Sequence, residues 1–202
     1  MTAAAEGPLS LERFIFETNR HGTRAMPLEQ FTALALRLDV DDALVGAHVR
    51  FCDDHYARNL ICRTTQFELL VLCWKPGQAS TIHDHAGSLN VTRVYSGDLT
   101  SRVFRRRDGG SGVATPGGAA AGELPSGPVD LVDEQVLAGS GAGSGAATVD
   151  RGTIHQLGNW SREGLITVHL YAPPLTDIVV YSTTDARTEV QRLRYSLADD
   201  FA

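Results

Sequence analysis

The sequence predicts a mainly β protein, an antiparallel β-barrel or sandwich preceded by helices. Short apolar or alternating runs recur between turn-forming residues over residues 55–185, which is the pattern of an all-β fold. The first 54 residues instead carry apolar residues at helical spacing. The chain has 202 residues, 43% of them apolar and 21% charged, which fits one globular domain. We therefore predict a single domain over residues 1–202.

Three helices are expected in the amino-terminal part. Ser10 precedes an amphipathic run as a possible cap, and residues 28–39 (LEQFTALALRLD) repeat apolar side chains at i, i+3 and i+4. A further short helix is expected over residues 41–51, where aspartates suit a helix N-terminus.

Strands are expected from residue 55 onwards. Residues 67–74 (FELLVLCW) form an apolar run of strand length. Residues 89–104 alternate, with a turn expected at Ser96-Gly97-Asp98. Two later runs, residues 165–173 and 177–183, are also strand-like and precede a short polar tail.

Two glycine-rich stretches interrupt the β region. Residues 108–128 are interpreted as an insertion, and a strand is expected after it. Residues 141–146 (GAGSGA) match a dinucleotide-binding loop on paper, but the β-branched residues that follow open no helix, which that motif requires. We therefore interpret this second stretch as a flexible hairpin connection.

Charge and composition exclude several classes of function. The net charge of −6 argues against nucleic-acid binding, whose electrostatic footprint is basic. No run approaches 18 apolar residues, so no membrane span is expected. The start of the chain lacks the features of a signal peptide, and three cysteines without a CxxC fit free thiols. A cytoplasmic monomer is expected.

Three histidines stand in an ordered context. His83 and His85 are i and i+2, so they share one face of a strand. Gly77, the two histidines, Asn90 and Gly97 reproduce the spacing of the first cupin motif, with asparagine in place of the usual glutamate. Residues 152–159 (GTIHQLGN) supply the second cupin motif and His155. The sequence thus predicts a cupin-type, jelly-roll-like barrel with a metal site of His83, His85 and His155.

This ligand set leaves the metal open between zinc, iron, copper and nickel, all of which imidazole suits. Three protein ligands leave free coordination positions, as in catalytic sites. Because Asn90 brings no charge, the ion keeps its full charge, and an anionic thiolate or carboxylate substrate is expected to bind it.

The chain resembles the bacterial cysteine dioxygenases of the thiol dioxygenase group of cupins. The resemblance runs from about Tyr56 to Tyr181 and lies in residues 56–60, 72–74, 80–85, 152–159 and 167–174. It implies Fe(II) on the three histidines. It also implies that Arg58 and Tyr56 recognise the substrate carboxylate, and that Thr167, His169 and Tyr171 form the family's Ser-His-Tyr series, with threonine replacing serine.

The residues themselves are consistent with these roles. The planar fork of Arg58 matches a carboxylate, while His169 and Tyr171 share one strand face at i and i+2. Thr167 and His169 would orient the phenol near the metal. In animal cysteine dioxygenases a cysteine stands at the position of Asn90 and forms a thioether with the tyrosine; asparagine excludes that crosslink here.

The expected reaction is the addition of both atoms of O2 to the sulfur of L-cysteine, giving cysteine sulfinic acid, a step of cysteine catabolism. Two alternatives remain open: a dioxygenase of another small thiol carboxylate, such as 3-mercaptopropionate or mercaptosuccinate, and a non-catalytic metal-binding cupin. Arg58 favours cysteine, because a glutamine takes its place in the mercaptopropionate type.

Overall fold

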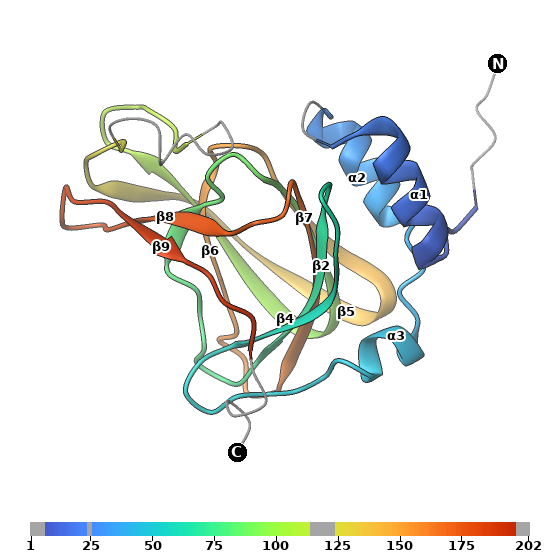
Figure 1. Cartoon of the computed structure of the whole chain (residues 1–202). Coiled ribbons are helices and arrows are strands. Elements are labelled where there is room, and N and C mark those ends of the chain that lie inside the picture. Colours follow the sequence, from blue (N-terminus) through green and yellow to red (C-terminus); the bar gives the residue numbers. More distant parts are fainter. Residues whose placement is uncertain (1–6, 24–25, 114–123, 197–202) are drawn as a thin grey trace.

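The computed structural model describes residues 7–23, 26–113 and 124–196, and shows a curled antiparallel β-sheet with helices on one side of it (Figure 1). Within these residues the helices are α1 Leu11–His21, α2 Leu28–Leu36 and α3 Asp42–Gly46. The strands are β1 Ala57–Arg63, β2 Glu68–Trp74, β3 Ile82–Asp84, β4 Leu89–Arg106, β5 Val129–Val149, β6 Ile154–Gly158, β7 Leu165–Ala172, β8 Asp177–Tyr181 and β9 Glu189–Arg192. The order across the sheet is β1-β2-β7-β4-β6-β3-β8-β9, and β5 pairs with β4. The predicted fold class, mainly β and antiparallel with amino-terminal helices, is confirmed.

The helices begin where the sequence predicts. Ser10 caps α1 by accepting a hydrogen bond from the Arg13 N–H at 3.3 Å, and Asp41 caps α3 by accepting from the Leu44 N–H at 2.7 Å. The helix expected over residues 41–51 is shorter than predicted, because α3 ends at Gly46.

After its first residue, Glu68, strand β2 is apolar because both of its faces are buried. Leu69, Val71 and Cys73 pack in the core beneath the helices, which also contains Phe14. Leu70, Leu72 and Trp74 point to the opposite side and pack in the interior of the curled sheet. Since alternate residues of a strand face opposite sides, one strand separates a helix-covered core from the interior that holds the site.

The prediction of a turn at Ser96-Gly97-Asp98 is wrong, because β4 continues through these residues to Arg106. The pairing of β4 with both neighbours shifts register between Val94 and Ser96, which marks a β-bulge. Gly97 follows the bulge with φ +87°, and a Cβ there would lie 2.7 Å from the Gly164 carbonyl oxygen. Gly97 therefore allows β4 to bend, and it does not form a hairpin turn.

The second glycine-rich stretch is not a hairpin connection, since it belongs to β5. Ser140 pairs with Ser96 and Gly145 with Val94, so the shift in register falls opposite the bulge of β4. A Cβ on Gly139 would lie 2.8 Å from the Val94 side chain. Glycine permits this close approach of two irregular strands. Of the first glycine-rich insertion, residues 114–123 lie outside the described part of the chain.

Two further expectations concern the tail and the cysteines. The polar tail contains β9, an edge strand whose four residues are all exposed, so it carries no apolar signal in the sequence. Cys52, Cys62 and Cys73 are free thiols, as predicted. Among the described residues, no helix has the length and apolar character needed to cross a membrane.

Candidate metal and substrate site

The three predicted ligands come together in the interior of the sheet. His83 on β3 stands directly opposite His155 on β6 in the antiparallel register, and His85 follows two residues after His83. The Nε2 atoms of His85 and His155 lie 2.9 Å apart, and one ring nitrogen from each of the three histidines lies within 4.8 Å of the others. All three side chains are buried.

Their chemistry fits a divalent metal ion. Nδ1 of His83 lies 2.9 Å from the Thr81 carbonyl oxygen, which fixes the ring and leaves Nε2 free. Burial lowers the pKa of His83 to about 4 and holds the pKa values of His85 and His155 well below the ordinary value. The imidazoles are therefore neutral, the form that binds metal. Nitrogens that share one ion at about 2.0–2.1 Å stand roughly 3 Å apart, close to the 2.9 Å between the His85 and His155 nitrogens.

Asp84, the residue between the two ligands of the first motif, is held in place by three hydrogen bonds. Its buried carboxylate accepts hydrogen bonds from the Ala86 N–H, the Val113 N–H and the Tyr181 hydroxyl, each at 2.7 Å. Val113, which belongs to the glycine-rich insertion, is thereby hydrogen-bonded to the strand that carries His83. Asp84 positions the ligands without pointing at them.

Arg58 and Tyr56 line the same cavity as His83 and His155, together with His169 and Tyr171. The free space in this cavity is about 10 Å³. Arg58 is only 7% exposed, yet its Nε and Nη2 make no hydrogen bond to any described residue. Buried guanidinium donors without partners are costly unless an acceptor reaches them, so the cavity suits a carboxylate at Arg58. The Tyr56 ring stacks on Trp74 at 4.2 Å between centroids and forms part of the wall.

Thr167, His169 and Tyr171 follow one another on the interior face of β7. Thr167 Oγ1 lies 2.8 Å from His169 Nε2, and His169 Nδ1 lies 3.1 Å from the Tyr171 hydroxyl. The Tyr171 ring meets the His85 ring edge-on at 5.2 Å between centroids and lies 5.8 Å from the Arg58 guanidinium carbon. Burial raises the pKa of Tyr171. A protonated phenol therefore stands between the histidine cluster and the arginine.

Neighbouring side chains fix which groups of this series donate hydrogen bonds and which accept them. The Trp74 indole N–H, which can only donate, reaches Thr167 Oγ1 at 2.9 Å. At the other end, the Asn90 amide donates to the Leu170 carbonyl oxygen, so its Oδ1 accepts from the Thr92 hydroxyl at 2.9 Å. Thr92 Oγ1 then has to accept from His169 Nδ1, 3.0 Å away.

Each of these short contacts can be a hydrogen bond only with one arrangement of protons. In that arrangement the Thr167 hydroxyl donates to His169 Nε2, and His169 carries its own proton on Nδ1. The Tyr171 oxygen then receives that shared proton, and its own proton is free for the cavity.

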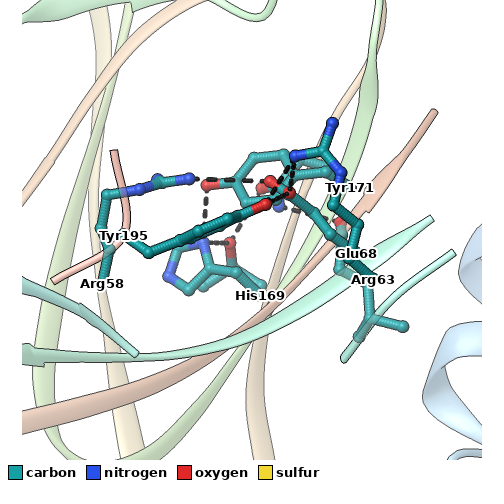
Figure 2. A network of polar contacts seen from close by, with 9 residues as sticks. Arg58, Arg63, Glu68, His169, Tyr171 and Tyr195 are labelled. Carbon is teal, nitrogen blue, oxygen red and sulfur yellow. Dashed lines mark hydrogen bonds and ion pairs between the residues drawn. The ribbon is translucent and has the colours of Figure 1, made fainter. Parts of the chain in front are cut away.

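Glu68 is a further residue of the site that sequence reasoning missed. It is fully buried, and its Oε1 lies 3.6 Å from Arg58 Nη2 (Figure 2). The signal was present as the single charged residue in the apolar run of residues 67–74. A lone carboxylate in a buried strand requires a cationic partner.

The fold and the site together define a mainly β protein whose curled antiparallel sheet encloses a buried three-histidine group that could hold a metal ion. The chain belongs to the cysteine dioxygenase type I family, whose model matches residues 24–184. Cysteine dioxygenase type 1 of Homo sapiens is 26% identical over 149 residues, 73% of this chain and 66% of that protein. The Danio rerio protein of the same name is 29% identical over 141 residues, 69% of this chain and 60% of that protein. The match thus spans less than two thirds of these relatives.

Among solved structures, the chain is similar to the protein TT1209 of Thermus thermophilus, with a TM-score of 0.47, 20% identity, and coverage of 68% of this chain and 99% of that one. A cupin family protein with a double-stranded β-helix fold from Methanocaldococcus jannaschii gives a TM-score of 0.40 at 8% identity, over 60% of this chain and 83% of that one.

Proposed function

We propose that this chain is a non-haem iron thiol dioxygenase that oxidises L-cysteine to cysteine sulfinic acid. One observation carries the proposal. A single cavity is lined by two members of the histidine group and by Arg58, whose Nε and Nη2 donors have no partner among the described residues, and the Tyr171 ring lies beside both Arg58 and His85. Family membership supports a thiol dioxygenase, and the arginine supports a substrate that also carries a carboxylate.

His83, His85 and His155 would hold the iron. Fe(II) on such a group supplies open coordination positions, favours the thiolate form of the substrate, and provides the redox chemistry. In the balanced reaction, a thiolate and one O2 give one sulfinate, so both oxygen atoms go to sulfur.

The chain's own residues position and protect the reactants. Arg58 would hold the carboxylate through two parallel hydrogen bonds, and Tyr56 would close the wall beside it. The Tyr171 hydroxyl would donate a hydrogen bond to the reacting sulfur or oxygen atoms, while Thr167 and His169 orient the phenol. The apolar lining, which includes Leu72, Leu157 and Ile178, excludes water and competing oxidation.

Oxygen uptake by the iron-loaded protein tests the proposal. Cysteine should be consumed with one O2 per sulfinate formed, and cysteamine, which lacks the carboxylate, should be a poor substrate. Arg58→Ala should lower kcat/KM for cysteine by one to three decades, about 1.4 kcal/mol each. Arg58→Lys should recover only part of this loss, because a point charge does not reproduce the fork.

Other outcomes identify the alternatives. Much faster turnover of 3-mercaptopropionate or mercaptosuccinate than of cysteine would assign another thiol carboxylate as the substrate. No oxygen uptake with any of these thiols, with iron bound, would indicate a non-catalytic metal-binding cupin. We further propose that the protein works as a monomer in the cytoplasm, which size-exclusion chromatography and cell fractionation can test.

A further inference from the structure

The substrate arginine lies beside a second carboxylate that does not pair with it fully. Glu68 Oε1 and Arg58 Nη2 are 3.6 Å apart, within ion-pair range, but neither atom makes a hydrogen bond within the described part of the chain. Buried carboxylates and guanidinium groups at this distance ordinarily close into short, charge-assisted hydrogen bonds. Glu68 must therefore be held back by other groups.

Those groups bind the other carboxylate oxygen. Glu68 Oε2 accepts a hydrogen bond from the Tyr195 hydroxyl at 2.6 Å and from Arg63 Nη1 at 3.2 Å (Figure 2). Arg63 Nη1 also donates to the Tyr195 oxygen at 2.5 Å. Burial and the hydrogen bond to Glu68 raise the pKa of Tyr195, so its hydroxyl remains a donor at neutral pH.

Tyr195 belongs to a short segment, residues 193–196, that follows β9 and is tied to Arg58. The Ser196 N–H donates to the Arg58 carbonyl oxygen at 3.0 Å, and the Arg58 N–H donates to Ser196 Oγ at 2.9 Å. Leu193 lines the cavity. The segment therefore contacts the backbone of Arg58 directly and its side chain through Glu68.

Resting on the proposed function, we propose that Tyr195 is a positioning residue for substrate specificity: it holds Glu68 back, so that Arg58 keeps its Nε and Nη2 donors free for a substrate carboxylate. Two guanidinium groups and one carboxylate leave one positive charge, which matches one substrate carboxylate. A small thiol monocarboxylate fits this balance, whereas a second carboxylate near Glu68 would be repelled. Without the Tyr195 hydroxyl, Glu68 turns toward Arg58 and competes with the substrate.

Tyr195→Phe tests this proposal, with Tyr95→Phe as the matched control, because the Tyr95 hydroxyl also contacts a carboxylate, that of Asp42, away from the cavity. The dissociation constants of L-cysteine and cysteamine are measured by calorimetry on iron-loaded protein without oxygen. Tyr195→Phe should weaken cysteine binding about tenfold, equivalent to 1.4 kcal/mol, and leave cysteamine binding unchanged. Tyr95→Phe should change neither constant.

Two further variants separate positioning from general support. Arg63→Met removes the other donor to Glu68 Oε2 and should also weaken cysteine binding selectively. Adding Glu68→Gln to Tyr195→Phe removes the competing charge and should restore cysteine binding. Equal loss for cysteine and cysteamine, wild-type binding in both single variants, or no restoration in the double variant would overturn the proposal.

The same proteins distinguish this inference from the proposed function. If cysteine binds with the expected dependence on Tyr195 but no oxygen is consumed, the dioxygenase assignment alone fails. If cysteine is oxidised and its binding does not depend on Tyr195, the inference alone fails.

Discussion

At the residue scale, the position of the ring proton of His169 follows from neighbouring groups whose roles as hydrogen-bond donor or acceptor are fixed. The Trp74 indole only donates, and the amide orientation of Asn90 is fixed by the Leu170 carbonyl oxygen. Between them, His169 is expected to carry its proton on Nδ1. Burial lowers its pKa to about 3, so the ring is neutral and has one definite tautomer. Through Thr167 and His169, the Trp74 indole N–H thus determines that the Tyr171 oxygen accepts a hydrogen bond.

We predict that 15N NMR of histidine-labelled, zinc-loaded protein shows the Nδ1–H tautomer of His169. Trp74→Phe frees Thr167 Oγ1 to accept from Nε2, and should shift the ring toward the Nε2–H form. Trp160→Phe is the control, because Trp160 is 44% exposed and lies over Arg102 instead. An unchanged tautomer in Trp74→Phe would show that the indole does not set the direction of the series.

Asn90 leads to a second prediction at this scale. It is fully buried and directly opposite Tyr171 in the pairing of β4 with β7. Since an amide cannot form a thioether, Tyr171 should remain an unmodified phenol after turnover. Intact mass should equal the sequence mass, with no loss of two hydrogens. A cysteine–tyrosine peptide in a digest would mean that another residue faces the phenol.

At the element scale, two irregular strands show what local sequence could predict. The apolar runs of β2 and β7 identify strands because burial of both faces leaves a direct pattern in the sequence. The bulges of β4 and β5 carry no such pattern, since glycine marks a turn and a bulge equally well. Only the opposing strand decides between them. The exposed strand β9 was missed for the same reason, because its pairing with β8 is its sole support in the described sheet.

The residues of the site also divide into those that a local sequence pattern could predict and those that it could not. The spacing of the histidines and of the series on β7 predicts which side chains meet, because each group lies on one strand face. Tyr195 reaches Glu68 across 127 residues of sequence, so no local pattern could have joined them.

Gly97 makes the role of the bulge in β4 testable. Gly97→Ala should destabilise the protein by about 1–3 kcal/mol through backbone strain, and more through the clash with the Gly164 carbonyl oxygen. Gly109→Ala is the control, because Gly109 has a similar φ of +82° but no atom within 4 Å of a Cβ. Urea unfolding should show a larger loss for Gly97→Ala. Equal losses would show that the close approach of the two strands contributes nothing.

At the scale of the whole molecule, the metal is expected to stabilise the fold. The histidines join β3 and β6, distant in sequence, so an ion bound there favours the folded state only. At a free metal concentration of 100 Kd this adds about 2.7 kcal/mol. Calorimetry should therefore show one cooperative transition, as expected of a single domain, with a Tm that chelator lowers.

Two variants check the source of this effect. His155→Ala should melt at the same temperature with and without chelator. His55→Ala should respond to chelator like the wild type, because His55 is exposed and lies outside the histidine group. A chelator effect that persists in His155→Ala would place the stabilising metal elsewhere.

The free space in the cavity is small, and on the proposed function this limits the size of the thiols that can enter it. Its walls are paired strands on most sides, and its free space of about 10 Å³ is room for roughly one water molecule. Admitting even a single amino acid requires local movement of the walls, and a peptide would require the sheet itself to open. Glutathione and the cysteine side chains of proteins should therefore remain unoxidised in a mixture from which free cysteine is consumed. The protein would thus be selective for the free amino acid over every larger molecule that contains the same thiol group.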